Sequence, residues 1–151
     1  MTKFVATAIV AVVLLSGTSL RASDAMKAII TSYVDIHEHL FRDKMDGVKP
    51  LAAAISLQAS RMGAGGAAMT AAAQRMEAAA DLKAARDAFG ALSDAVIAAG
   101  NAEGWKDVPD IKVAYCPMAN KSWLQKEGTI RNPYYGPVMP TCGDFKKPGS
   151  R

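Results

Sequence analysis

The chain has 151 residues, a formal net charge of +4, and a composition that is 50% hydrophobic. This length corresponds to one domain of ordinary size, which can bury a hydrophobic core without external help. The basic residues form no stripe interleaved with aromatic side chains, so the composition argues against a nucleic-acid-binding protein.

The N-terminus has the pattern of a secretory signal peptide. Lys3 precedes an unbroken apolar run from Phe4 to Leu15, as in the charged and hydrophobic regions of exported proteins. A run of about 12 apolar residues is too short to cross a hydrocarbon core, which requires about 20. Small residues permit cleavage after Ala22 or after Ala25, and the sequence does not choose between them. We therefore expect residues 1–25 to be removed on export.

The expected product of this cleavage is a periplasmic or secreted protein that is not embedded in the membrane. Thr18 stands where a bacterial lipoprotein would carry its acylated cysteine. Cleavage also removes Lys3 and Arg21, two of the 18 basic residues, and leaves the remainder nearly neutral against 14 acidic residues.

Residues 23–101 have the composition and periodicity of a helical bundle. They are rich in Ala, Met and Leu, and their apolar residues recur at steps of three and four. The pattern predicts helices over about 23–43, 48–62, 69–79 and 82–99, with glycines breaking the chain at 63–66. We expect Asp81 to be the N-cap of the last helix, and the alternative is one long helix over 69–99. We therefore predict an all-α fold, a small antiparallel bundle of three to four helices.

The composition changes after Gly100. From Gly104 onward the chain holds six of its seven prolines, both tryptophans and both cysteines, and its turn signals are frequent. Residues 121–126 are long enough for a helical turn or two, and residues 111–115 for a short extended piece. We expect an irregular, aromatic- and Pro-rich C-terminal cap that folds back over the bundle. The predicted single domain covers 26–146, with the cap from about 104 and a solvated tail at 147–151.

Both cysteines lie in this cap, each close to a methionine. Cys116 is followed by Pro117 and Met118, and Met139 precedes Cys142 by three residues. An exported protein with two cysteines usually joins them in a disulfide, because its compartment is oxidising. The first interpretation is therefore a structural Cys116–Cys142 disulfide.

A soft-metal site is the second interpretation of the same four residues. Thiolate and thioether ligands favour Cu(I) over harder cations, and neutral thioethers add no excess negative charge. Zinc fits less well, because it rarely accepts thioether ligands. The candidate metal ligands are Cys116, Met118, Met139 and Cys142, and oxidation of the two thiols would block such a site.

Other candidates favour structural roles. His37 and His39 are two residues apart on a helix and point about 200 degrees apart, so they cannot share one metal. The helical methionines lie in the core stripes, where they fill gaps. The chain has no zincin motif, nucleophile elbow or P-loop, and we do not expect an enzyme.

Several phrases of the cap carry a resemblance to a known family. They are Val-Ala-Tyr-Cys-Pro-Met-Ala at 113–119, Ser-Trp-Leu at 122–124, Ile-Arg-Asn-Pro-Tyr-Tyr-Gly at 130–136, Met139 and Thr-Cys-Gly at 141–143. The chain resembles a bacterial periplasmic domain family of unknown function, whose members occur alone or attached to CusB-type heavy-metal efflux adaptor subunits. The resemblance extends over about 25–146 and includes the helix that leads to the cap.

The resemblance implies a helical bundle capped by the two cysteine loops, in a copper or heavy-metal context. With the sulfur chemistry, it predicts a soluble periplasmic protein that binds Cu(I) or a related soft ion and works with a heavy-metal efflux system or another periplasmic protein. The chain has no hairpin or lipoyl-like segments, so it would not be the adaptor itself. The alternative is a disulfide-stapled interaction domain that partners a membrane or efflux complex without metal.

Overall fold

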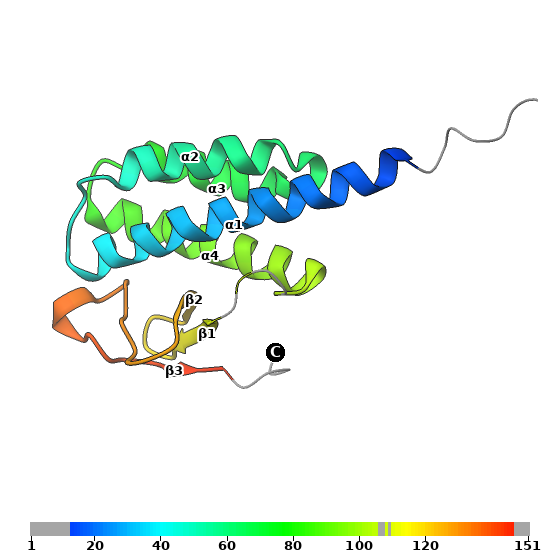
Figure 1. Ribbon diagram of the computed structural model, residues 1–151. Helices are drawn as coiled ribbons and strands as arrows, with labels where there is room; N and C mark the ends of the chain where they lie inside the picture. Colours follow the sequence, from blue (N-terminus) through cyan, green and yellow to red (C-terminus); the bar gives the residue numbers. More distant parts are fainter. Residues whose placement is uncertain (1–12, 106–107, 109, 147–151) are drawn as a thin grey trace, which may run out of the picture.

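The computed structural model describes residues 13–105, 108 and 110–146, and Figure 1 shows their arrangement. The helices are α1 (Val13–Phe41), α2 (Val48–Ser60), α3 (Ala67–Glu77) and α4 (Leu82–Glu103), with a short 3-10 turn, Gly63–Gly66, before α3. Part of the expected signal peptide, residues 1–12, lies outside the described residues, and residues 13–25 form the first turns of α1. The expected tail at 147–151 also lies outside them.

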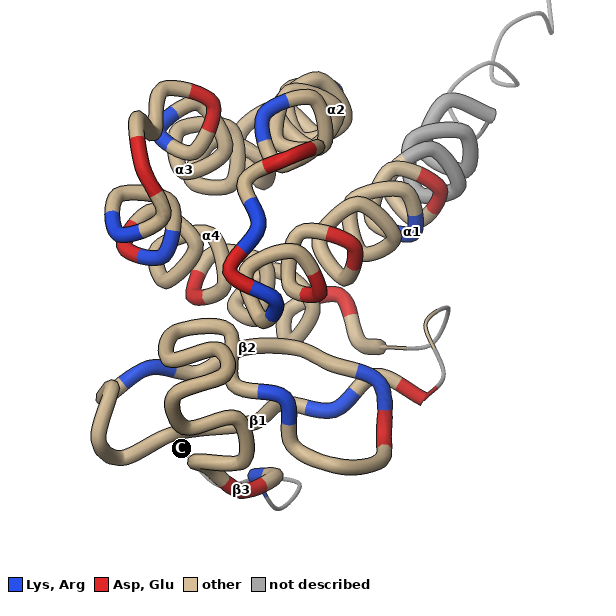
Figure 2. Tube along the Cα trace, turned by 90° about the vertical axis from the view of Figure 1, so that its left-hand side faces the viewer, with Lys and Arg blue, Asp and Glu red and all other residues tan. Residues whose placement is uncertain are grey.

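Helices that follow one another in sequence pack side by side. α2 and α3 lie on the side of the bundle away from the cap, while α1 and α4 lie next to it (Figure 2). The apolar stripe of α4 is buried, including Ala85, Phe89, Leu92 and Val96. The break before α4 falls at Asp81, whose carboxylate accepts a hydrogen bond of 2.8 Å from the backbone N–H of Ala84. The predicted N-cap is thus confirmed.

The C-terminal cap contains a sheet, and the prediction of an all-α fold is therefore wrong. β1 (Ile111–Cys116), β2 (Lys121–Lys126) and β3 (Asp144–Phe145) form an antiparallel sheet in the order β2–β1–β3. β1 and β2 pair along their whole lengths, so residues 121–126 are a strand and not a helical turn. Six residues are too few for hydrophobic periodicity to separate strand from helix, and the neighbouring strand decides the conformation. The fold is α+β.

The helices and the cap share one hydrophobic core. Trp123 and Leu124 of β2 are buried against the bundle, together with Tyr33 of α1 and Phe89 of α4. The Tyr33 and Phe89 rings stack with centroids 4.7 Å apart, and the Tyr134 ring of the cap lies 6.0 Å from Phe89 and 5.9 Å from Trp123. This aromatic cluster joins the cap to the helices.

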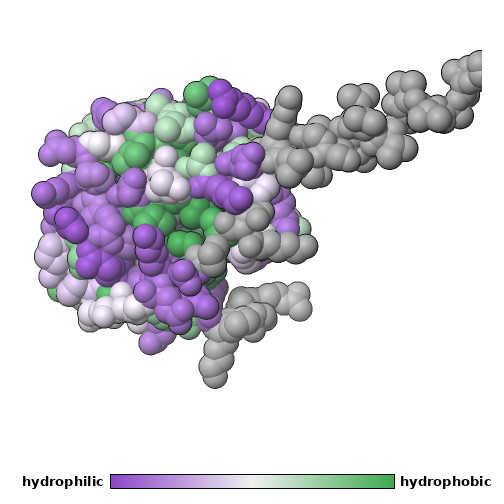
Figure 3. Space-filling view, in the orientation of Figure 1, coloured by the Kyte–Doolittle hydropathy of each residue, from purple (hydrophilic) through white to green (hydrophobic). Residues whose placement is uncertain are grey.

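The surface of the described part is mixed in character. Hydrophilic residues cover much of the face in Figure 3, and hydrophobic side chains gather near its middle. Within the described residues, no helix combines the length and the apolar character needed to cross a membrane.

Candidate thiol site in the C-terminal cap

The structure brings the two cysteines together. Cys116 is the last residue of β1, and Cys142 lies in the turn just before β3. Because β1 and β3 pair with Tyr115 opposite Asp144, the two sulfurs face each other across the strand ends. Their Sγ atoms are 2.6 Å apart, and the two residues are not joined by a disulfide bond. Cys116 is fully buried, whereas Cys142 is half-buried.

A glycine allows the Cys142 turn to lie flat against β1. Gly143 has a φ of +129°, which residues with side chains rarely adopt. A Cβ at this position would lie 2.8 Å from the carbonyl oxygen of Tyr115 and 2.9 Å from the Trp123 ring. The Thr-Cys-Gly phrase thus needs its glycine for both backbone conformation and close approach.

The two thiols differ in their electrostatic environment. Burial by itself raises the pKa of the Cys116 thiol, but hydrogen bonds from Cys142 and from the backbone N–H groups of Ala119 and Met118 leave that pKa below its usual value. The Ala119 N–H lies 3.4 Å from the Cys116 sulfur. Contact with Cys116 raises the pKa of Cys142. The contact between the sulfurs therefore makes it easier for one thiol of the pair to become a thiolate, the form that binds metals and attacks disulfides, while the other keeps its proton.

The two predicted thioether ligands do not share the environment of the two thiols. The Met118 side chain is 65% exposed and lines an open cleft between α4 and the β1–β2 turn, a cleft that neither cysteine lines. Met139 is half-buried, and its carbonyl oxygen accepts a hydrogen bond of 3.3 Å from the Cys142 N–H. Of the four predicted ligands, the structure brings the two thiols into contact and directs Met118 into the neighbouring cleft.

Asn132, in the Asn-Pro-Tyr-Tyr phrase, holds the Cys142 turn through hydrogen bonds to the backbone. Its side chain is fully buried and donates a hydrogen bond of 2.8 Å to the carbonyl oxygen of Cys142. Its Oδ1 accepts from the backbone N–H groups of Tyr134 and Tyr135, at 2.8 and 3.2 Å. The sequence showed this phrase as a motif, and the structure shows that its asparagine positions the Cys142 turn.

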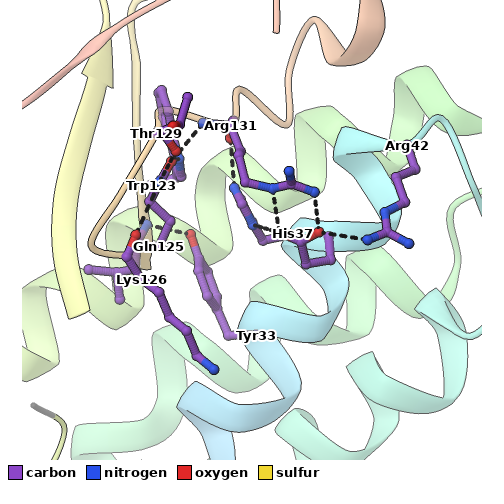
Figure 4. Close-up of polar contacts among 10 residues, drawn as sticks. Tyr33, His37, Arg42, Trp123, Gln125, Lys126, Thr129 and Arg131 are labelled. Carbon is purple, nitrogen blue, oxygen red and sulfur yellow. Dashed lines mark hydrogen bonds and ion pairs between the residues drawn. The ribbon is translucent and has the colours of Figure 1, made fainter. Parts of the chain in front are cut away.

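His37 and Glu38 of α1 hold the cap through Arg131 (Figure 4). His37 Nε2 lies 2.7 Å from the carbonyl oxygen of Arg131, and because a carbonyl only accepts, Nε2 carries the proton. Glu38 accepts from the Arg131 guanidinium through both carboxylate oxygens, at 2.7 and 2.5 Å. The sequence indicated only a structural role for His37 and did not reveal this contact, because the partner lies 94 residues away.

Within the part of the chain that the structure describes, no group of three or more His, Cys, Asp and Glu side chains could hold a metal ion. Comparisons with known protein families, with curated proteins and with solved structures found no match to this chain.

Proposed function

We propose that this protein binds Cu(I) or a related soft metal ion in the periplasm, and that the thiolates of Cys116 and Cys142 are its principal ligands. The observation that supports the proposal is that two thiols from positions 26 residues apart meet in the cap, where both could serve as ligands to one ion. The family resemblance adds the context of copper or heavy-metal handling. On this proposal the protein buffers the ion or passes it to an export system, and it catalyses no reaction.

The chemistry of the pair suits a soft ion. The contact between the two sulfurs favours ionisation of one thiol of the pair, and soft sulfur ligands select Cu(I). A two-thiolate set supplies fewer ligands than the four that structural zinc sites use, whereas Cu(I) is stable with two. Met139 and Met118 are the nearest thioethers along the chain, and Met118 would have to turn out of the cleft to join the site.

A disulfide-stapled interaction domain is the second candidate, and the short sulfur separation favours it. Two sulfurs that share one metal ion, each at about 2.3 Å, lie about 3.7–4.6 Å apart. The Sγ atoms here are 2.6 Å apart, so metal binding requires the pair to open while oxidation requires it to close slightly. In this case the cap would bind a protein partner, and the only role of the two cysteines would be to close the loop between them with a disulfide.

An anaerobic titration separates the two candidates. The protein is purified from the periplasm, its free thiols are counted, and the reduced form is titrated with Cu(I) against a chelator of known affinity. A double variant, Cys116→Ala with Cys142→Ala, and a thioether variant, Met118→Leu with Met139→Leu, are titrated in parallel. We expect tight one-to-one binding that the cysteine variant loses. The metal-binding proposal is excluded if the isolated protein has no free thiols and its reduced form binds Cu(I) no better than the cysteine variant. Only the disulfide candidate would then remain.

A further inference from the structure

The two sulfurs of the Cys116–Cys142 pair differ in their access to solvent. Cys116 is 0% exposed and belongs to the hydrophobic core that the cap shares with the helices. Cys142 is half-buried and lies in a turn between Thr141 and Asp144, which are both exposed. A reagent in solution therefore meets Cys142 first, and it reaches Cys116 only when the cap opens.

Contacts that do not involve sulfur hold both cysteines in place. β1, which ends at Cys116, pairs with β2 along its whole length. β3 follows the Cys142 turn and pairs with β1, and the Asn132 side chain donates a hydrogen bond of 2.8 Å to the carbonyl oxygen of Cys142. These contacts exist although no disulfide bond joins the two residues. The two sulfurs therefore stay within reach of each other whether or not a bond joins them.

A backbone donor is available to the buried sulfur. The N–H of Ala119, in the turn between β1 and β2, lies 3.4 Å from Cys116 Sγ. A hydrogen bond to a charged group stabilises its charged form, so this N–H stabilises the thiolate that Cys116 becomes when a Cys116–Cys142 disulfide is broken. Disulfides break faster when the departing thiolate is more stable. Attack at Cys142, with Cys116 departing, is thus the favoured direction of opening.

We propose that Cys116 and Cys142 form a reversible dithiol–disulfide couple, which exchanges with small thiols and disulfides from solution through Cys142. Exposed disulfides are the labile ones, whereas protected structural disulfides resist reduction. The external partner is small, since a half-buried sulfur in a turn is easier for a small molecule to reach than for the cysteine of a folded protein. The inference concerns the same two sulfurs as the proposed function, but it requires no metal ion.

Oxidation of the pair by an external disulfide takes two steps. The Cys142 thiolate attacks one sulfur of the external disulfide, forms a bond to it and displaces the other sulfur as a thiolate. The Cys116 thiolate then attacks Cys142 Sγ, forms the Cys116–Cys142 bond and releases the second external thiolate. The protein loses two electrons, which the external disulfide gains, and the protons of the two cysteines pass through solvent to the released thiolates. Because both sulfurs are already in place, the second step is fast.

Reduction follows the same path in reverse. An external thiolate attacks Cys142 Sγ, and Cys116 leaves as the thiolate that the Ala119 N–H stabilises. A second external thiolate then attacks the external sulfur of the mixed disulfide and releases Cys142. If the proposed function holds, this exchange also controls it, because only the reduced pair offers two thiolates to a soft metal ion.

Trapping the mixed disulfide with glutathione tests the inference without metal. Cys116→Ser and Cys142→Ser are incubated with oxidised glutathione and a metal chelator, and intact-mass spectrometry follows the adduct. We expect Cys116→Ser to form a stable adduct at Cys142 about tenfold faster, or more, than Cys142→Ser forms one at the buried Cys116. In urea, where burial is lost, the two variants should react at similar rates. Reduced glutathione should open the disulfide of the folded, oxidised protein.

A second measurement does not depend on the folding of the variants. The reduced, unaltered protein is treated with a substoichiometric amount of an alkylating reagent, and peptide mapping should find the label mainly on Cys142. The inference is overturned if Cys116 is labelled equally, if the two variants form adducts at equal rates in the folded state, or if reduced glutathione opens the disulfide only in urea. Because no metal is present, these results leave the Cu(I) proposal untouched, and the anaerobic titration decides that proposal separately.

Discussion

The His37 imidazole of α1 donates a hydrogen bond of 2.7 Å from Nε2 to the backbone carbonyl of Arg131 in the cap. His37 is 1% exposed, and its Nδ1 is the one buried side-chain nitrogen or oxygen without a hydrogen-bond partner among the described residues. This lack of a partner favours the neutral ring, although Nδ1 lies 3.6 Å from Oε1 of Glu38. Burial lowers the pKa of His37 below its ordinary value of 6.5, although the hydrogen bond to the Arg131 carbonyl and the Glu38 carboxylate oppose this effect, and the positive charge of Arg131 adds to it.

We expect the free energy of unfolding to decrease as the pH falls below about 6.5. The unfolded chain takes up the His37 proton near its ordinary pKa of 6.5, while the folded protein resists protonation to a lower pH. The contribution of the neutral His37 ring to the free energy of unfolding is therefore complete above pH 6.5, and it is lost as the pH falls through the folded-state pKa of this residue. Urea unfolding across this range measures the slope.

A His37→Gln variant separates this effect from that of Glu38. Glutamine can still donate to the Arg131 carbonyl but does not titrate. Glu38 also has a lowered pKa through its ion pair with Arg131, so its contribution is lost below its ordinary value of 4.5. The variant should lose the slope just below pH 6.5 and keep the one at lower pH. If the upper slope persists, another group causes it.

Tyr33→Phe should destabilise the protein by about 1–3 kcal/mol, because it leaves buried polar groups unsatisfied. The Tyr33 hydroxyl lies 2.5 Å from the Ser93 hydroxyl and accepts from the backbone N–H of Leu124 at 3.1 Å, so it joins α1, α4 and β2. Tyr115→Phe is the matched control, since it removes a solvent-exposed hydrogen bond to Asn120. Thermal and urea unfolding of both variants check this difference, and equal losses would contradict it.

Arg86→Lys should cost about 2–3 kcal/mol even though it keeps the charge, because lysine lacks the fork of donors that arginine offers. Arg86 donates to the carbonyl oxygens of Pro133 and Leu40, at 2.7 and 3.0 Å, and pairs with Asp43. Lys83→Ala, which removes an exposed ion pair with Asp87, serves as the control and should barely move the urea midpoint. A fully stable Arg86→Lys variant would show that the ion pair alone matters.

The helices could be predicted from the sequence because their signals are local. The stripe that includes Phe89, Leu92 and Val96 repeats over many turns, and Asp81 is an N-cap by chemistry that needs no distant partner. The extended piece expected at 111–115 is confirmed as β1. The sheet and the strand β2 could not be predicted, because these strands form by pairing with each other and with β3, which lies near the end of the described chain.

The candidate site divides in the same way. Both interpretations of the sequence required Cys116 and Cys142 to meet, and the structure places their sulfurs in contact. The side-chain direction of Met118 and the partner of His37 could not be predicted, because each depends on how the cap sits on the helices. The sequence indicated Asn132 only as a member of a motif. Its role could not be predicted, because it depends on the positions of the backbone groups that its side chain binds.

Gly143→Ala should both destabilise the cap and open the thiol pair. A matched control separates the two causes, since Gly128 has nearly the same φ, +136° against +129°, but open space around its missing Cβ. Both alanine variants bear the cost of the backbone conformation, and only Gly143→Ala meets the Tyr115 carbonyl and the Trp123 ring. We expect Gly143→Ala to lose about 1–3 kcal/mol more than Gly128→Ala, the usual cost of overpacking.

The rate at which a thiol reagent labels the reduced protein supplies the second measurement. If the Gly143 turn presses Cys142 against Cys116, Gly143→Ala should label faster at both sulfurs, and it should form the Cys116–Cys142 disulfide more slowly under mild oxidation. Gly128→Ala should label and oxidise as the unaltered protein does. Equal labelling of the two variants would show that the sulfur contact does not depend on the turn.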